Sequence, residues 1–127
     1  MDLFEIVAKR RSVRAYADRP VEERNLEAIL MAANHAPSAG NLQAYEIYVA
    51  REASTLRALA AAALGQEFIA RAQVVLVFCA HPARAAERYG ERGKRLYAVQ
   101  DATIACTFAM LAATALGLAT VWVGAFD

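Results

Sequence analysis

The C-terminal part of the chain contains a run of 25 residues, Ala102–Phe126, without a single charged side chain. An uncharged apolar run of this length is either buried inside a protein or long enough to cross a membrane as a helix. Gly117 interrupts the run; alanine and threonine dominate before it, and β-branched residues are common after it. Because glycine often ends helices and β-branched residues favour strands, we interpret the run as a buried helix over 96–116 and a buried strand over 120–124. A membrane helix is the alternative.

Helical periodicity is visible in three earlier segments. Helices are expected at 3–10, 21–35 and 54–65. Asp2 is placed to cap the first, and Leu26, Ile29 and Leu30 give the second a one-sided apolar face. Ser54 is a candidate cap for the third, which Gly65 would end.

Two further segments predict strands. Residues 45–50 (YEIYVA) alternate in polarity, whereas residues 74–79 (VVLVFC) are continuously apolar, which is typical of a strand covered on both faces. The charged segment 81–95, with Pro82 and two glycines, is expected to be the least ordered part of the chain. Without repeats or a linker, the pattern predicts one α+β domain over residues 1–127.

The charge balance and the cysteines exclude several classes of protein. The net charge of +1 lacks the basic excess of a nucleic-acid binder, and the charged first 14 residues do not resemble a secretory signal. We therefore expect a cytoplasmic protein, with Cys79 and Cys106 as buried reduced thiols. His35 and His81 are expected at helix ends or on the surface, and the sequence predicts no metal site. Apolar residues make up 58% of the chain, which indicates surface hidden by a ligand or another subunit.

Three segments can carry chemistry. In Arg10–Arg14 (RRSVR), Arg10, Ser12 and Arg14 alternate, so an extended backbone would place two guanidinium groups and a hydroxyl on one side, as phosphate binding requires. Residues 36–43 (APSAGNLQ) form a loop of uncharged donors and acceptors, and 117–124 (GLATVWVG) end an apolar strand in glycine. Taken alone, each segment has an ordinary interpretation. Residues 10–14 could be a solvated helix end, residues 36–43 a capped turn, and residues 117–124 part of the packed core.

Together and in this order, the three segments resemble the FMN-dependent nitroreductase family, whose pattern is R-R-S-x-R, then A-P-S-x-x-N-x-Q, then G-L-x-T-x-W-x-G. The resemblance implies a central, mostly antiparallel or mixed sheet flanked by helices, in an intertwined homodimer. It also implies FMN at the subunit interface, NADH or NADPH as electron donor, and a small acceptor such as a nitroaromatic or a quinone. Neither nucleic acid nor a membrane is expected as a partner.

The resemblance also assigns the cofactor residues. Arg10, Ser12 and Arg14 would hold the phosphate, the ribityl chain and the flavin O2 edge, with help from Arg11. The partner subunit would contribute Pro37, Ser38, Ala39 and Asn41. Gln66 would touch the pyrimidine edge, and the backbone of Gly124 and Ala125 would face flavin N5 and O4. No catalytic side chain is expected, because the flavin performs the redox chemistry.

The chain also departs from the family pattern. Ala44, Tyr45 and Gln73 stand where the family often has Pro, Trp and Pro. Family members usually continue beyond the equivalent of Asp127 into an arm that crosses the partner, and we expect that arm to be missing here. Two alternatives to nitroreductase activity stay open. One is other flavin chemistry on this fold, such as dehalogenation, flavin fragmentation or heterocycle dehydrogenation. The other is a flavin-binding domain without catalysis, or a fragment that needs a partner chain.

Overall fold

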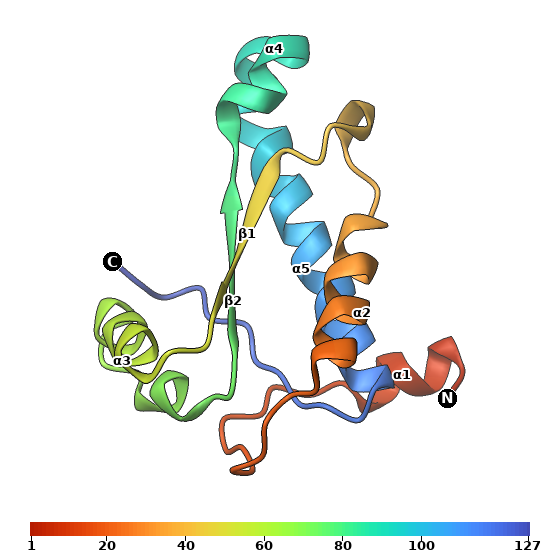
Figure 1. Cartoon of the computed structure of the whole chain (residues 1–127). Helices are drawn as coiled ribbons and strands as arrows, with labels where there is room; N and C mark the ends of the chain where they lie inside the picture. Colours follow the sequence, from red (N-terminus) through yellow and green to blue (C-terminus); the bar gives the residue numbers. More distant parts are fainter.

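The computed structural model describes residues 1–127, which form helices around a small sheet (Figure 1). In chain order the elements are α1 (Leu3–Lys9), α2 (Glu23–Asn34), the 3-10 turn η1 (Ala39–Asn41), β1 (Tyr45–Ala50), α3 (Ala53–Ala62), the 3-10 turn η2 (Glu67–Arg71), β2 (Val75–Ala80), α4 (Pro82–Arg92), the π-helical turn η3 (Gly93–Tyr97) and α5 (Ala98–Ala115).

The core lies between α5, α2 and the sheet. The alanines of α5 that recur at helical spacing are buried, namely Ala102, Ala105, Ala109 and Ala113. They pack against Ile29 and Ala33 of α2, and small side chains allow two helices to approach closely. This face of α5 is therefore covered by a helix of the same chain.

The sheet has two antiparallel strands, β1 and β2, paired from Tyr45 opposite Ala80 to Ala50 opposite Val75. Of the helices, α5 makes the main contact with both strands. β2 was expected to be covered on both faces, yet all six of its residues are only half-buried. The chain itself therefore covers β2 incompletely.

The segment 120–124 does not form the predicted third strand. Only Thr120 pairs, in an isolated parallel bridge with Ser12, while residues 121–127 belong to no helix or strand. A strand needs a neighbouring strand of several residues to pair with, and the stretch around Ser12 offers only one paired residue.

Two of the predicted helix ends are confirmed by their hydrogen bonds. The Asp2 side chain accepts from the Glu5 amide, and the Glu5 side chain accepts from the Asp2 amide in return, which makes a capping box. Gly117, with φ 78°, ends α5, and the Leu118 amide donates to the Ala113 carbonyl. This is the left-handed glycine stop that the sequence indicated.

Two other local expectations are wrong. Ser54 lies inside α3, because the helix already begins at Ala53 after Glu52, which makes no side-chain cap. The charged segment 81–95 is helical rather than irregular: Pro82 takes the first helical position, where it is tolerated, and the His81 ring accepts from the Arg84 amide. Gly90, with φ 59°, kinks α4 without ending it.

By length and apolar content, the helical stretch Pro82–Ala115 contains a window that could cross a membrane. In the structure, the alanine face of α5 packs on α2 and on the sheet. A globular domain's core helix has this packing, so the structure favours the buried-helix interpretation.

The contact between α2 and α5 has no room for a larger side chain at Ala105, whose exposed fraction is 0%. We expect Ala105→Leu to lower the free energy of unfolding by about 1–3 kcal/mol, because added methylenes must displace α2. Urea unfolding followed by circular dichroism measures the change. Ala28→Leu, at an exposed position of α2, is the matched control, and an equal loss in both variants would contradict this account of the core.

Candidate functional site

The first and third of the chemistry-bearing segments lie side by side. The Val13 amide donates to the Thr120 carbonyl at 2.9 Å, within the parallel bridge that joins Ser12 to Thr120. Segment 10–14 therefore runs next to the start of segment 120–126, although the two are far apart in the sequence.

Gln66 joins this region from the turn before η2. Its side-chain amide donates to the Ala125 carbonyl at 3.0 Å and to the Ala63 carbonyl at 2.9 Å. Close by, the Arg14 guanidinium lies over the Phe68 ring, 5.9 Å from its centroid. The structure thus links Ser12 to Thr120 and Gln66 to Ala125, two positions of the same C-terminal segment.

Three arginines and one hydroxyl of this region lack polar partners within the chain. Arg10, Arg11 and Arg14 take part in none of the four ion pairs. The Thr120 hydroxyl is buried without a hydrogen-bond partner. A buried hydroxyl without a partner costs about 1–3 kcal/mol, so such a group beside free cations is a candidate contact for an anionic, hydrogen-bonding ligand.

The polar loop 36–43 is held in an unusual backbone conformation. Gly40 and Asn41 have φ angles of 61° and 56°, in the region that glycine adopts freely and asparagine tolerates. The Ser38 hydroxyl accepts from the Gln43 amide at 3.1 Å, and the Asn41 side chain accepts from the Gln43 side chain at 2.8 Å. These bonds fix the outline of the loop and the direction of its polar edge.

Asp101 anchors this loop to α5. Its two carboxylate oxygens accept from the amides of Ala39 at 3.1 Å and Ala44 at 3.2 Å, and its exposed fraction is 3%. The buried charge is therefore satisfied by backbone donors at both ends of the loop. Burial raises the pKa of the Tyr45 hydroxyl, and the negative charge of Asp101 raises this pKa further. Tyr45 therefore stays neutral and donates a hydrogen bond to the Asn34 side chain of α2.

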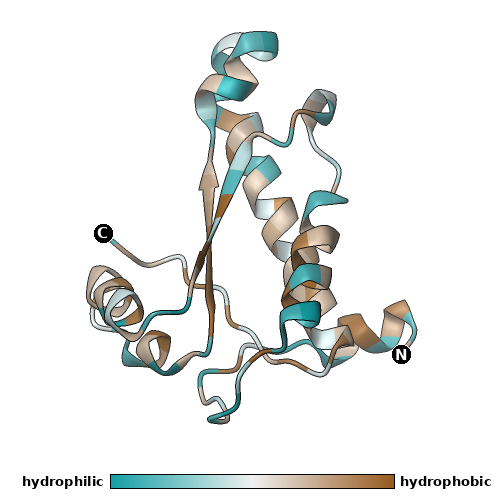
Figure 2. Ribbon diagram, in the orientation of Figure 1, coloured by the Kyte–Doolittle hydropathy of each residue, from teal (hydrophilic) through white to brown (hydrophobic).

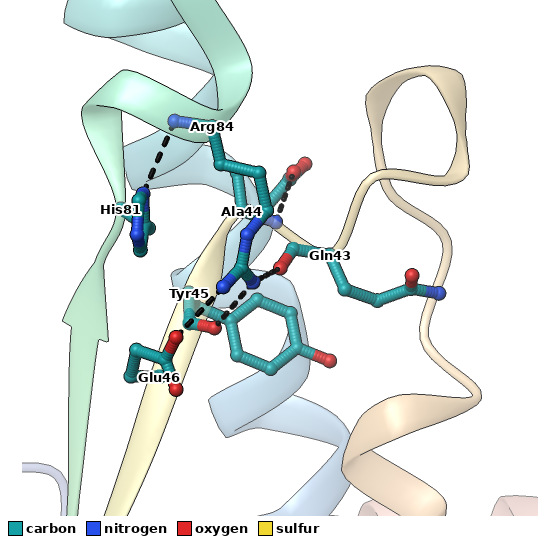
Figure 3. A network of polar contacts seen from close by, with 7 residues as sticks. Gln43, Ala44, Tyr45, Glu46, His81 and Arg84 are labelled. Carbon is teal, nitrogen blue, oxygen red and sulfur yellow. Dashed lines mark hydrogen bonds and ion pairs between the residues drawn. The ribbon is translucent and has the colours of Figure 1, made fainter.

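A second anchor comes from α4 (Figure 3). The Arg84 guanidinium donates to the carbonyls of Gln43 at 2.7 Å and Tyr45 at 3.2 Å, and pairs with Glu46 at 2.7 Å. In Figure 3, Arg84 reaches from the start of α4 across to the beginning of β1. Asp101 and Arg84 together hold the loop from two helices.

Within one chain the two halves of the predicted site are separate. Figure 1 shows the loop around η1 at one end of α2 and α5, and segment 10–14 near the other end. The 12 residues of α2 alone span about 18 Å. Pro37, Ser38, Ala39 and Asn41 therefore do not meet Arg10, Ser12 and Arg14 in the same chain, which is compatible with their assignment to a partner subunit.

Sequence reasoning missed both loop anchors. Asp101 is the last charged residue before the uncharged run, one helical turn from the buried Ala98 and Ala105, and that position was a usable signal of a buried carboxylate. Arg84 lies in a segment that we expected to be irregular, so its role needed the helix. Neither residue belongs to a metal cluster, since no group of three potential ligands comes together in the structure.

The surface hollow, the cysteines and the histidines of the chain lie outside the candidate site. A surface hollow of about 470 Å³ lies between Tyr16, the start of α3 and η2, and none of the predicted cofactor residues lines it. Both cysteines are half-buried and free, less enclosed than expected. Burial raises the pKa of Cys106 to about 11, so its nucleophilic thiolate is scarce near neutral pH. His35 ends α2 and His81 begins α4, as expected for helix-end histidines.

The sequence matches the model of the nitroreductase family over residues 7–66 and 58–127. The chain belongs to the nitroreductase family. Among its relatives are the FMN reductase [NAD(P)H] of Bacillus subtilis, 32% identical over 98% of this chain, and the oxygen-insensitive NADPH nitroreductase of Salmonella typhimurium, 31% identical over 95%. This chain covers 54% and 52% of the lengths of those two proteins.

Solved structures confirm the fold. NfrA2 of B. megaterium superposes with a TM-score of 0.89 at 30% identity, over 98% of this chain and 55% of the other. The oxidoreductase YcnD of Bacillus subtilis gives the same TM-score at 31% identity. The expected α+β nitroreductase-like fold is therefore confirmed, and the chain spans about half the length of these family members.

Asp101→Asn tests the anchoring of the loop. An amide of the same shape offers one oxygen acceptor instead of two, so one buried backbone N–H loses its partner. We expect the free energy of unfolding to fall by about 1–3 kcal/mol, measured by urea unfolding. Glu27→Gln, an exposed residue of α2 in no ion pair, is the matched control. Unchanged stability in Asp101→Asn would show that the carboxylate does not hold the loop.

Proposed function

We propose that this nitroreductase-family chain binds FMN and works as an oxidoreductase, taking electrons from NADH or NADPH and passing them to a small acceptor such as a nitroaromatic or a quinone. The carrying observations are the bridge between Ser12 of the arginine segment and Thr120, whose buried hydroxyl has no partner, and the hydrogen bond from Gln66 to Ala125 in the same C-terminal segment. The names of the Bacillus subtilis and Salmonella typhimurium relatives, an FMN reductase and an NADPH nitroreductase, support the same activity.

The residues present fit FMN chemically. Arg10 and Arg14 supply guanidinium forks for a phosphate or an anionic ring edge, and Ser12 and Thr120 supply hydroxyls for a sugar-like chain. An FMN phosphate or ribityl hydroxyl would satisfy the Thr120 hydroxyl, which the chain itself leaves without a partner. Gly124 and Ala125 offer backbone groups that a planar ring can approach closely.

When bound, FMN supplies two-electron transfer between a nicotinamide donor and the acceptor. The chain then needs to bind and orient the reactants and to supply charge, without a side-chain acid or base. Arg14 would keep a fixed positive charge beside the ring and favour its more negative, reduced state.

We propose that the working form is a homodimer in the cytoplasm. The chain exposes 8104 Å², whereas a compact monomer of 13.8 kDa exposes about 6,600 Å². The excess is comparable to the area that each partner buries in a large, obligate interface. No residue of α1 is buried, and its apolar side chains Leu3, Phe4 and Val7 are exposed. A second copy would cover these faces and could bring the polar loop to segment 10–14.

Absorption spectroscopy tests the cofactor. The purified protein should take up added FMN and retain the flavin absorption bands after gel filtration. Arg14→Gln should make the midpoint potential more negative by about 30 mV, which corresponds to the loss of about 1.4 kcal/mol of charge stabilisation. Arg57→Gln, an exposed arginine on α3 in no ion pair, is the control and should not shift the potential. A colourless protein that takes up no FMN would end the proposal.

Sedimentation tests the dimer. Phe4 is 83% exposed in the single chain. If a second copy covers α1, Phe4→Glu should place an unpaired charge in the interface and shift the protein towards monomer. Glu27→Gln again serves as the control, because it alters an exposed residue without adding a charge. Sedimentation equilibrium that gives a monomer for the unaltered chain would contradict the dimer while leaving the FMN result to stand separately.

A further inference from the structure

The segment formed by α4 and η3 carries a concentration of positive charge beside the polar loop. Residues 82–97 contain five basic and two acidic side chains, whereas the whole chain has 14 and 13. Figure 2 shows hydrophilic residues on α4 at the end of the molecule where the loop also lies. The predicted cofactor residues do not include any part of this segment.

Two of its arginines are fixed on aromatic rings. The Arg88 guanidinium lies 5.5 Å from the centroid of the Tyr89 ring, and the Arg92 guanidinium lies 5.5 Å from that of Tyr97. The two rings meet edge to face, with centroids 5.1 Å apart, and Arg92 also donates from Nε to the Tyr97 hydroxyl at 2.8 Å. The four side chains form one contiguous group, which we call the Arg–Tyr cluster.

The cations of this cluster have no carboxylate partner. Elsewhere in the segment, Arg84 pairs with Glu46 and Arg95 pairs with Glu91, but neither Arg88 nor Arg92 takes part in an ion pair. Stacking orders a guanidinium and leaves donors at its edge free for an anion. Arg88 and Arg92 therefore combine restricted geometry with unused hydrogen-bond donors.

The cluster touches the polar loop. A methyl group added at Gly40 would lie 2.6 Å from the Tyr89 hydroxyl and 3.1 Å from Nη1 of Arg88. Gly40 thus lets the loop pass directly beneath the cluster. Because Asp101 and Arg84 fix the loop, the position of the cluster relative to Ser38 and Asn41 is fixed as well.

We propose that the Arg–Tyr cluster binds the phosphates of the nicotinamide dinucleotide that donates electrons. This inference rests on the proposed function, in which the loop of one chain lies beside the flavin held by the other. A donor with its nicotinamide at the flavin must place its phosphates outside the ring site, and the cluster supplies a cationic surface at that rim. Planar guanidinium groups match phosphate oxygens in pairs, which favours this ligand over a neutral acceptor.

Steady-state kinetics of the FMN-loaded protein test the proposal with three donors: NADPH, NADH and N-benzyl-1,4-dihydronicotinamide, which has no phosphate. The double variant Arg88→Gln with Arg92→Gln should raise KM for the dinucleotides about tenfold or more with little change in kcat, because charge-assisted hydrogen bonds to phosphate are lost. Its activity with the phosphate-free donor should be unchanged.

Arg95→Gln is the matched control, since it removes a charge from the same segment at a residue that pairs with Glu91. A larger KM increase for NADPH than for NADH would assign the cluster to the 2′-phosphate, and equal increases would assign it to the pyrophosphate. The proposal is overturned if the double variant leaves both KM values unchanged, weakens all three donors equally, or matches Arg95→Gln.

Isothermal titration of the FMN-free chain with NADP⁺ separates this inference from the proposed function. If the chain takes up no FMN, the proposed activity fails, yet weaker NADP⁺ binding by the double variant than by Arg95→Gln would still support the cluster. Equal NADP⁺ binding by the two variants would overturn it. Thermal unfolding of both variants establishes that they are folded, because exposed arginines should contribute little to stability.

Discussion

The buried carboxylate of Asp101 holds the two ends of the polar loop to α5, and the geometry on that side of the molecule depends on it. Without its bonds to the Ala39 and Ala44 amides, the left-handed conformations at Gly40 and Asn41 would lose their main restraint. A charge inside a protein is costly, and it persists when donors surround it. Here those donors are backbone amides of the loop, so the same hydrogen bonds stabilise the buried charge and fix the shape of the loop.

The α2–α5 contact determines where the two halves of the candidate site lie. Alanines bring the helices close together, and the loop leaves α2 at one end while segment 10–14 approaches α5 at the other. The rigid core therefore keeps the two groups of predicted FMN residues apart within a chain. The same arrangement leaves an apolar face on α1 and a half-covered sheet, the surfaces through which a second copy could bring those groups together.

Local patterns in the sequence predicted what local physics determines. The Asp2 cap, the Gly117 stop and strand β1 follow from side chains within a few residues, and each is confirmed. The third strand failed because a strand depends on its neighbour, and the stretch around Ser12 offers a single bridge. The partner of the alanine face of α5 could not be predicted, since periodicity identifies a face to be covered and not the surface that covers it.

The same limit applies to the candidate site. The ordered motifs indicated the family, and two of the residues that they singled out, Gln66 and Ala125, are hydrogen-bonded to each other. Asp101 and Arg84 could not be placed from spacing, because their partners are backbone groups dozens of residues away. The bridge between Ser12 and Thr120 has a consequence for the order of folding. It joins segments about 100 residues apart, and closing so long a loop is entropically expensive and slow. During synthesis, the arginine side of the site must wait until Thr120 has left the ribosome, so a shorter nascent chain has no preformed place for the proposed cofactor.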